Sequence, residues 1–438
     1  MNPRAEIVIV GAGIAGVAAA YRLAVRRGVR NVVLIDEREP VTLTSDKGTQ
    51  GYRNWWPGPD DTMLRFVSRS IDLLEEMGEE THNLFRLNRR GYLFVSAEDD
   101  GAARLLEQAH AVSRLGMGEV REHASVASYA PAPAEGYCNQ PTGADFLHGD
   151  AALRAFPFLA PSTKAALHVR RAGYMNAVAL SAWMLKQSLA AGVTFVREGV
   201  TGIDTTGGAV RAVQLASGAR VETNRVVLAA GPAMADVGRM VGVELPLFHE
   251  LHAKVTLSDE RGAIPRSAPF TIWVDPMRLE IGGAMRDMPG GLHVRPVDGP
   301  NGNELFLIWT YHTETTAPMW PPSFDPQYAE ICVRGLAELV PSLGAGFADS
   351  GLGFVDGGYY CKARDNRPLI GPLPVEGAYA LGGLSGTGIM SAHASADLLA
   401  GHVMHEPLPD YAAAFLPSRF DDASYVERVK QWSLTGQL

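Results

Sequence analysis

Near its start the chain passes from four apolar residues directly into a glycine-rich turn. Ile7–Val10 form the apolar run, Gly11–Gly16 the turn, and residues 17–24 that follow have strong helix propensity. A second apolar run at residues 31–35 then leads to Asp36. Because strand, turn, helix and strand occur in this order, the sequence predicts a parallel βαβ unit at the start of the fold.

The three glycines of this turn suit a dinucleotide-binding site. Gly11 permits the tight turn, Gly13 lets the backbone approach a pyrophosphate, and Gly16 lets the helix pack close to the strand. The start of the helix presents free N–H groups and a positive dipole to phosphate. Asp36 follows at about the 20-residue interval at which a carboxylate binds a ribose 2′-hydroxyl. We therefore expect FAD or NAD here, rather than an ordinary strand-to-helix connection.

Composition excludes several classes of protein. The chain has 438 residues, of which 46% are hydrophobic and 20% charged, which is typical of a globular protein with two sizeable cores. Its net charge is −9 and its basic pairs are scattered, so no nucleic-acid partner is expected. No apolar stretch approaches the roughly 18 residues of a membrane span. Cys138, Cys332 and Cys361 are far apart, which predicts no metal site and a reduced, cytoplasmic protein.

Three stretches follow before the middle of the chain. Residues 42–53 are polar and rich in glycine, and either wrap a cofactor or form a solvated loop. Residues 62–79 have apolar side chains at helical spacing, which predicts a packed helix. Residues 92–95 read as a strand and residues 102–115 as another helix. Residues 116–150 are rich in Ala, Pro and Gly without a clear period, which favours an insertion or a lid-like loop.

The rest of the chain alternates between two patterns. A strand at 166–169, a helix at 177–191 and a strand at 193–196 are followed by a meander at 210–222 and a strand at 225–232. From residue 245, strands at 253–257, 270–274, 279–282, 291–295 and 305–311 predict an antiparallel sheet. A helix at 326–339 precedes a final strand, glycine-rich turn and helix at 378–402. Since no second G-x-G-x-x-G occurs, we expect no separate nicotinamide domain, and the substrate itself must reduce the cofactor.

Four segments together resemble one family. They are the turn at 11–16, Leu228–Pro232, Asp365–Gly371 and Ser385–Gly388. In this order they resemble the FAD-dependent D-amino acid oxidase superfamily, nearest the sarcosine oxidase, glycine oxidase and dimethylglycine dehydrogenase branch. The resemblance implies an α/β fold, α+β overall. A Rossmann-like FAD-binding domain would comprise residues 1–90, 165–243 and 355–438, and an antiparallel-sheet substrate-binding domain residues 91–164 and 244–354.

The resemblance also implies which residues hold FAD. The ADP half, the ribityl chain and the flavin would lie along residues from four parts of the chain, with Val200 near the adenine. These residues are Gly11, Gly13, Ile14, Ala15, Gly16, Asp36, Glu37, Ser45, Lys47, Gly48, Thr49, Gln50, Val200, Ala230, Gly231, Gly386, Thr387, Gly388, Ile389 and Met390. Gly358 stands where sarcosine oxidase has its flavin-linking cysteine, and Cys361 is displaced by three residues, so FAD should be non-covalent.

Three residues are candidates for catalysis by the same resemblance. Arg53 falls near a carboxylate-binding arginine, although it could equally be a surface or phosphate-pairing arginine. His293 occupies the place of an oxygen-activating lysine, where a cationic imidazole could serve oxygen or a polar substrate, or a neutral histidine could simply pack. Tyr360 matches an active-site tyrosine, with packing as its alternative. Thr387 and Met390 replace a histidine and a lysine of sarcosine oxidase and make the pocket less cationic.

The function implied is oxidation of a C–N bond in an amino acid or a secondary amine. Hydride would pass to flavin N5, the imine would be hydrolysed, and O2 or another acceptor would reoxidise the flavin. Trp55 and Trp56 either enlarge the aromatic surface of the pocket or belong to the core. Two other functions stay open: oxidation of the C–OH of a 2-hydroxy acid or polyol, and a non-catalytic FAD-binding subunit of a larger complex.

Overall fold

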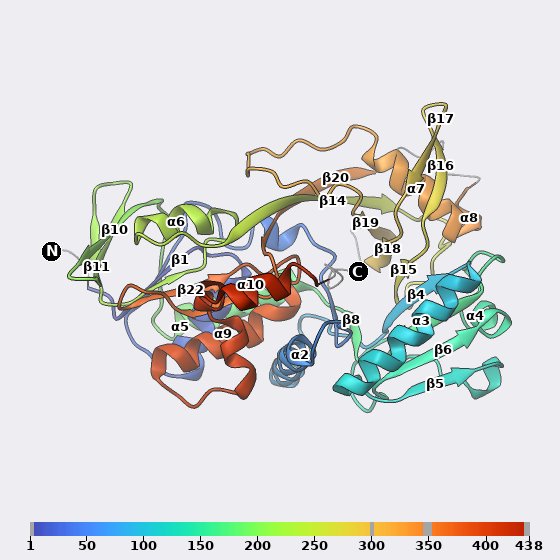
Figure 1. Cartoon of the computed structure of the whole chain (residues 1–438), viewed down its shortest axis with the longest axis horizontal. Helices are drawn as coiled ribbons and strands as arrows, with labels where there is room; N and C mark the ends of the chain where they lie inside the picture. The colour runs from blue at the N-terminus through green and yellow to red at the C-terminus, as the bar shows by residue number, and fades with distance from the viewer. Residues whose placement is uncertain (1–3, 298–301, 345–352, 433–438) are drawn as a thin grey trace.

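The computed structural model describes residues 4–297, 302–344 and 353–432. Two sheets dominate it, and they lie toward opposite ends of the molecule (Figure 1). The glycine-rich turn is in the first sheet, and the strands after residue 245 are in the second. Among the described residues, no helix is long and apolar enough to cross a membrane.

The first sheet has six strands, drawn from three separate parts of the chain. In spatial order they are β21 (Leu369–Pro372), β22 (Ala378–Gly382), β13 (Val226–Leu228), β1 (Ile7–Val10), β2 (Val32–Ile35) and β9 (Thr194–Val196). All neighbours are parallel except β21 and β22. The predicted βαβ unit is therefore confirmed, with α1 (Ile14–Ala20) continuing as a π-helical turn to Arg26.

The two faces of this sheet are covered differently. Alternate side chains of a strand point to opposite faces, and Ile7 and Ile9 pack with α1, α2 (Thr62–Glu80), α5 (Ala177–Ala190) and α9 (Gly388–Met404). Val8 and Val10 pack instead against a meander. The meander consists of β10 (Val200–Thr206), β11 (Ala209–Leu215) and β12 (Arg220–Glu222), and α6 (Met234–Met240) adjoins it.

The second sheet has nine strands and is mostly antiparallel. Its order is β20 (Phe354–Ala363), β14 (Leu247–Ser258), β19 (Glu304–Trp309), β18 (Leu292–Val297), β15 (Phe270–Trp273), β4 (Tyr92–Ser96), β7 (Ala165–Val169), β6 (Ala144–His148) and β5 (Val120–His123). Only the β15–β4 and β5–β6 pairs are parallel. The helices that accompany this sheet are α3 (Asp99–Val112), α4 (Gly149–Ala155), α7 (Tyr328–Leu339) and α8 (Pro341–Gly344).

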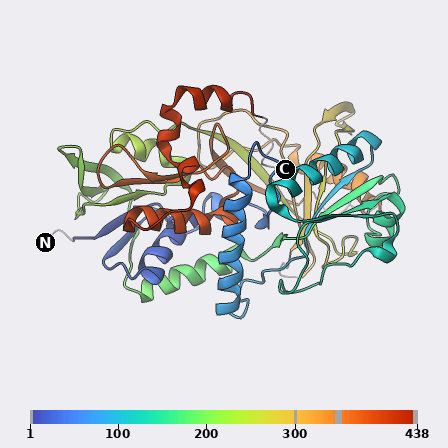
Figure 2. The same cartoon turned by 60° about the horizontal axis from the view of Figure 1, so that its bottom comes forward.

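The two sheets approach each other at the centre of the molecule. β14 and β20 are long paired strands that reach toward the first sheet (Figure 1). Figure 2 shows the blue helix α2 standing between the two ends. The short pair β3 (Gly51–Arg53) and β8 (Ala172–Tyr174) lies on the connection, and α10 (Ala423–Val429) is the last helix described.

Two sequence predictions are wrong. Residues 116–150 are not a structureless loop, because they supply β5 and β6 to the edge of the nine-stranded sheet. Asp145, a polar residue in a buried strand, hides the apolar pattern and is paired with Arg121 and Arg170. The strand at 279–282 exists as β16 (Met277–Ile281), but it pairs only with β17 (Ala284–Met288) in a separate hairpin.

The division into two domains stays a prediction. The three segments predicted to form the FAD-binding domain supply all six strands of the first sheet. β7 begins at residue 165, the predicted boundary, and is hydrogen-bonded between β4 and β6 in the second sheet.

Candidate active site

Two adjoining cavities lie where the sheets meet. The smaller has a volume of about 150 Å³ and borders the glycine-rich turn, and the larger has a volume of about 370 Å³ and borders β14 and β20. Residues common to both walls show that the cavities form one cleft; they are Gly48, Tyr360, Ser385, Gly386 and Ile389.

The smaller cavity is built on the glycine cradle, Gly11–Gly16. Gly11 has φ +104°, and a Cβ there would lie 2.4 Å from the Ala229 carbonyl oxygen. A Cβ on Gly16 would lie 1.8 Å from the Gly11 oxygen. The Ala12 N–H donates to Asp36 Oδ2 at 2.7 Å, and the Ile14 N–H donates to Ser45 Oγ at 3.0 Å. Positions 11 and 16 therefore require glycine because the backbone contacts there are too close for a side chain, as the sequence predicts.

Most of the predicted cofactor residues line this cleft. In the smaller cavity are Gly11, Gly13, Ile14, Ala15, Asp36, Ser45, Gly48, Ala230, Gly231, Gly386, Gly388 and Ile389. In the larger are Gly48, Thr49, Gln50, Gly386, Thr387, Ile389 and Met390. The polar segment at 42–53 thus lines the cleft rather than forming a solvated loop.

Four predicted residues lie outside both walls. Gly16 packs behind the turn, and Lys47 pairs with Asp46 at 3.0 Å. Glu37 is exposed beyond Asp36, and a Cβ on Gly199 would lie 3.6 Å from Glu37 Oε2. Val200 therefore directly follows Gly199, the residue beside Glu37.

The residues of the cleft suit a dinucleotide. Its narrow end combines a backbone cradle with the Asp36 carboxylate, which is the donor and acceptor set for a pyrophosphate and a ribose. Its wide end is bordered by the N-terminus of α9. Gln50 and Ser385, both in its wall, have φ of 58° and 49°. Non-glycine residues in this left-handed region concentrate at ligand sites.

Arg53 is buried and lines the larger cavity, so a surface role is excluded. Its guanidinium carbon lies 5.3 Å from the centre of the Tyr92 ring, and its backbone N–H donates to Met390 Sδ at 3.1 Å. Burial lowers the pKa of the guanidinium from its usual value, yet arginine stays charged. The side chain therefore presents a desolvated cation to the cavity.

His293 lines the same cavity but is not the cation that sequence reasoning considered. Its Nδ1 lies 2.7 Å from the Gly291 carbonyl oxygen, and its ring lies 5.6 Å from that of Phe270. Burial lowers the pKa of His293 to about 4. The imidazole is therefore neutral at pH 7, which favours polar contact over positive charge.

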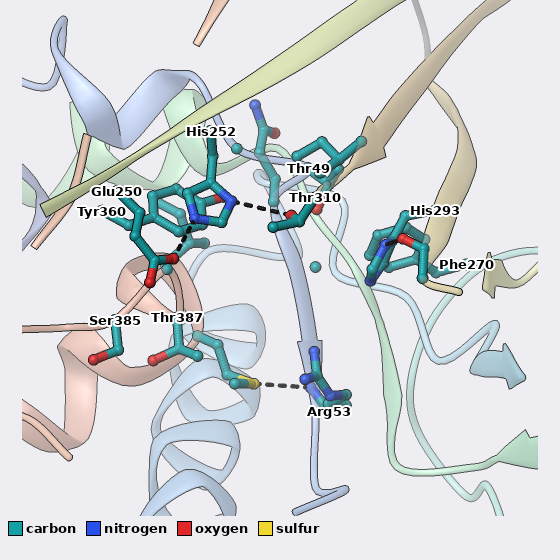
Figure 3. A pocket seen from close by; sticks show the side chains of 18 of the residues that line it. Thr49, Arg53, Glu250, His252, Phe270, His293, Thr310, Tyr360, Ser385 and Thr387 are labelled. Atoms are coloured by element: carbon teal, nitrogen blue, oxygen red, sulfur yellow. Dashed lines mark hydrogen bonds and ion pairs between the residues drawn. The ribbon is translucent and has the colours of Figure 1, made fainter. Parts of the chain in front are cut away.

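A polar cluster of Glu250, His252, Thr310 and Lys362 forms another wall, and sequence reasoning missed it. Figure 3 shows Glu250, His252 and Thr310 of this cluster. The Glu250, His252 and Lys362 side chains are each 3–5% exposed. Lys362 Nζ donates to Glu250 Oε1 at 2.8 Å, His252 Nε2 lies 3.1 Å from Glu250 Oε2, and His252 Nδ1 lies 3.1 Å from Thr310 Oγ1. Glu250 and His252 share a face because they are two residues apart on β14. Lys362 reaches them only because β20, a distant part of the chain, pairs with β14.

Burial and charge set the protonation of this cluster. Burial would raise the pKa of Glu250, but its hydrogen bonds from His252 and Lys362 outweigh burial and hold that pKa below its usual value. Burial lowers the pKa of His252 more than Glu250 raises it. Tyr360 stacks on His252 with ring centres 3.9 Å apart and planes 14° apart, and burial raises its pKa to about 12. The Glu250 carboxylate is therefore ionised, and the His252 imidazole and the Tyr360 phenol are neutral.

The structure shows where Trp55, Trp56 and Cys361 lie. Trp55 and Trp56 are buried in the core, with Trp55 packed 5.3 Å from Phe94, so they add no aromatic surface to the larger cavity. Cys361 lines the smaller cavity, where burial raises the pKa of its thiol to about 12. In the part of the chain that the structure describes, no group of three or more His, Cys, Asp or Glu is arranged to hold a metal ion.

A Rossmann-like sheet carrying a dinucleotide cradle, faced by a second sheet that closes a wider cavity, defines a flavin-dependent oxidoreductase. The family model for FAD-dependent oxidoreductases, called DAO, matches residues 6–401. The chain belongs to this family, and its cofactor is FAD.

Relatives and solved structures agree with this assignment. Mitochondrial dimethylglycine dehydrogenase of Rattus norvegicus is 25% identical over 438 residues, which cover 95% of this chain but only 45% of the relative. The chain thus spans about half the length of that relative. L-proline dehydrogenase of P. horikoshii superposes with a TM-score of 0.77 at 19% identity, covering 96% of this chain and 99% of the other. Glycine oxidase of Geobacillus kaustophilus gives 0.76 at 18%, covering 95% and 99%.

Proposed function

We propose that this protein oxidises a C–N bond of an amino acid or an N-substituted amino acid. The observation that carries the proposal is the wall of the larger cavity, where the buried Arg53 guanidinium and the side-chain oxygens of Glu250 and Thr310 belong to the same wall (Figure 3). Arg53 suits a carboxylate, whereas Glu250 and Thr310 suit an amine. The names of dimethylglycine dehydrogenase, proline dehydrogenase and glycine oxidase all denote substrates with these two groups.

Each wall of the cavity has a task under this proposal. Arg53 holds the carboxylate and fixes the orientation of the α-carbon. Phe270 and Tyr92, whose ring centres lie 4.4 Å apart, exclude water from the same space. The neutral His293 offers a hydrogen bond without repelling a cationic amine. Bound FAD supplies the redox chemistry by accepting hydride at N5, and water then hydrolyses the imine.

FAD is held, on this proposal, by the residues that line the cleft and without a covalent bond. Cys361 is a protonated thiol at pH 7, and the thiolate is the nucleophilic form of cysteine. Gly358 offers no side chain, and a Cβ there would lie 3.0 Å from Thr44 Cα. Acid precipitation of the yellow protein should therefore release all of the flavin to the supernatant, and a flavin that stays with the pellet would contradict non-covalent binding.

Anaerobic flavin absorbance tests the proposed reaction. Purified yellow protein is mixed with a panel of amino acids, N-methyl amino acids and 2-hydroxy acids, and air is then readmitted. We expect an amino acid or an N-methyl amino acid to bleach the flavin band. Recovery in air would identify an oxidase, and its absence a dehydrogenase with another acceptor. Bleaching by hydroxy acids alone would replace the proposal with C–OH oxidation, and no bleaching at all would favour a non-catalytic subunit.

A further inference from the structure

The His252–Thr310 pair lies between two cavities. Both residues line the larger cavity of the cleft, and both also line an outer cavity of about 570 Å³. The outer cavity contains His312, Glu314 and Asp325, none of which borders the cleft. The hydrogen-bonded pair therefore connects a buried space, where a substrate would react, to a space lined by titratable groups.

The hydrogen bonds fix the direction in which a proton can move. An ionised carboxylate only accepts hydrogen bonds, so His252 Nε2 carries the hydrogen that Glu250 Oε2 accepts at 3.1 Å. In the neutral ring His252 Nδ1 is then the acceptor, and the Thr310 hydroxyl donates to it at 3.1 Å. The lone pairs of the Thr310 oxygen can therefore accept a hydrogen bond from a donor in the cavity.

Within this arrangement Glu250 is the group that stabilises a positive charge on the imidazole, whereas burial and Lys362 oppose that charge. Glu250 is held by Lys362 at 2.8 Å, and the ring plane of His252 is held by its stack on Tyr360. Glu250, His252 and Thr310 are hydrogen-bonded in series. In this geometry a hydroxyl can pass its proton to an imidazole that the acid holds in orientation. The acid stabilises the imidazolium that forms.

We propose that Thr310 and His252 take the proton from the substrate's ammonium nitrogen and deliver it toward the outer cavity. The step rests on the proposed amine oxidation. The ammonium gives one proton to the Thr310 oxygen as the Thr310 hydroxyl proton passes to His252 Nδ1. The nitrogen lone pair released in this way would be available to form a C=N bond as the neighbouring carbon loses hydride, the two-electron oxidation for which bound FAD would be the acceptor.

The outer cavity is suited to receive the proton. His312 Nε2 lies 3.5 Å from Asp325 Oδ2, and His312 Nδ1 lies 3.7 Å from Glu314 Oε2. The backbone N–H of Gln327, a hydroxyl from Tyr311 and His312 together hold the pKa of Asp325 below its usual value despite burial, so Asp325 supplies a negative charge that attracts a proton to this side without binding it tightly. Because Thr310 lines both cavities, a proton held on His252 can return to the Thr310 oxygen and leave on the outer side.

The pH dependence of this step has identifiable sources. The charged or titratable groups facing His252 are Glu250 on its own strand, Lys362 and Tyr360 on β20, and His293 on β18. Burial keeps His252 neutral near pH 7, as an acceptor must be. Flavin reduction should therefore slow as the pH falls and His252 becomes protonated.

Thr310→Val removes the hydroxyl while keeping the shape of the side chain. We expect anaerobic stopped-flow reduction of the variant by an amine substrate to be about 100-fold slower than wild type at pH 7. The defect should narrow as the pH approaches about 10, because an aliphatic amine then enters without its proton. Thr310→Ser restores the hydroxyl and should restore the wild-type rate at every pH.

Thr271→Val is the matched control. Thr271 is buried on β15 of the same sheet, its hydroxyl donates to the Pro269 carbonyl, and it borders neither cavity. Its reduction rate should equal that of wild type. If Thr310→Val does not retain FAD, Glu250→Gln keeps the size of the side chain and should give a smaller defect with the same pH trend.

Several results would overturn the relay. A Thr310→Val defect of equal size at all pH values would mean a structural role, and an unchanged rate would mean that the hydroxyl is not used. A Thr310→Ser variant as slow as Thr310→Val would also exclude proton transfer through the hydroxyl. Wild-type protein that no amine bleaches would overturn the proposed function itself, which is a separate outcome.

Discussion

The two ends of the cleft are built on different principles. The glycine cradle lies in one short segment whose spacing is recognisable in the sequence. A Cβ on Gly16 would collide with the Gly11 oxygen of the same turn, and a Cβ on Gly11 with the Ala229 carbonyl oxygen after the neighbouring strand β13. The polar cluster depends on side chains that meet only because β14 pairs with β20 along one edge and with β19 along the other. The first end can hold a cofactor common to many enzymes, whereas the second end can select one substrate. The comparison teaches that cofactor binding is locally encoded here and that specificity depends on tertiary structure.

Breaking the cradle should have the largest effect. Gly16→Val places a side chain where even a Cβ would lie 1.8 Å from the Gly11 oxygen, so α1 must move away from the turn. We expect colourless protein with a greatly lowered melting temperature, since overpacking alone costs about 1–3 kcal/mol. Flavin absorbance and a thermal melt measure both effects.

Gly28→Asn is the control for the cradle. Gly28 has φ +67°, and apart from its chain neighbours no described residue has an atom within 4 Å of the position that a Cβ would take there. Asparagine tolerates this conformation. The variant should bind FAD as wild type does. Retention of flavin by Gly16→Val would show that the cradle does not require close packing.

Breaking the polar cluster should cost stability as well as activity. Lys362→Met leaves the Glu250 carboxylate buried without the cation that now lies 2.8 Å away. Removing one partner of a buried pair costs about 3–5 kcal/mol. Denaturant unfolding should show this loss, and the double variant Glu250→Gln with Lys362→Met should recover part of it. A loss below about 1 kcal/mol would mean that the pair is not energetically coupled.

Arg53→Lys sharpens the comparison at the substrate end. Lysine keeps the charge but lacks the planar fork that binds a carboxylate through two hydrogen bonds. We expect the apparent Kd of the amino acid substrate to rise about 10- to 100-fold, from the usual energy of such bonds. The apparent Kd of the amine that lacks the carboxylate should not change. Anaerobic flavin titration measures both Kd values.

Arg211→Lys is the corresponding control, because Arg211 is exposed on the meander, far from the cleft wall. Equal losses for the amino acid and its decarboxylated analogue in Arg53→Lys would argue against carboxylate binding by Arg53.

The smallest effect concerns pH. The pKa of Glu250 is lowered in the folded protein because hydrogen bonds from His252 and Lys362 outweigh burial. Such a carboxyl stabilises the fold above its unfolded pKa of about 4.3 and loses that contribution as the pH falls through its folded pKa. The melting temperature of wild type should therefore exceed that of Glu250→Gln from pH 7 to about 5, and the difference should shrink below that range.

Glu79→Gln, at an exposed position on α2, should show no such difference at any pH. A wild-type advantage that grows on acidification would contradict the assigned ionisation of Glu250.

Sequence reasoning succeeds where a pattern is local. The strand, turn and helix at the start and the strand, turn and helix at the end are confirmed because spacing along the chain decides their structure. Binding of FAD by the cradle and Asp36 stays a prediction. Arg53, His293 and Tyr360 do line one cavity, but their roles stay proposals. β6 was missed because Asp145 interrupts its apolar pattern, and only the tertiary partners of Asp145 explain its burial. β5 was missed because it is a short edge strand with mostly polar residues.

The polar cluster could not be predicted for a related reason. Glu250 and His252 share a face at a spacing of two residues, which is the only local signal. Thr310 and Lys362 lie far along the chain, and the register of β14 against β20 pairs Phe248 with Lys362. Strand register over such distances is not encoded in any short segment.

Product analysis tests the central claim most directly. Yellow protein is reduced anaerobically by the acyclic amino acid that bleaches it fastest, because a cyclic one would keep its nitrogen in the product. The carbonyl product and the released amine or ammonia are quantified against the flavin reduced. The account predicts one carbonyl product and one amine or ammonia for each FAD reduced. A carbonyl product formed without any release of nitrogen would contradict C–N oxidation.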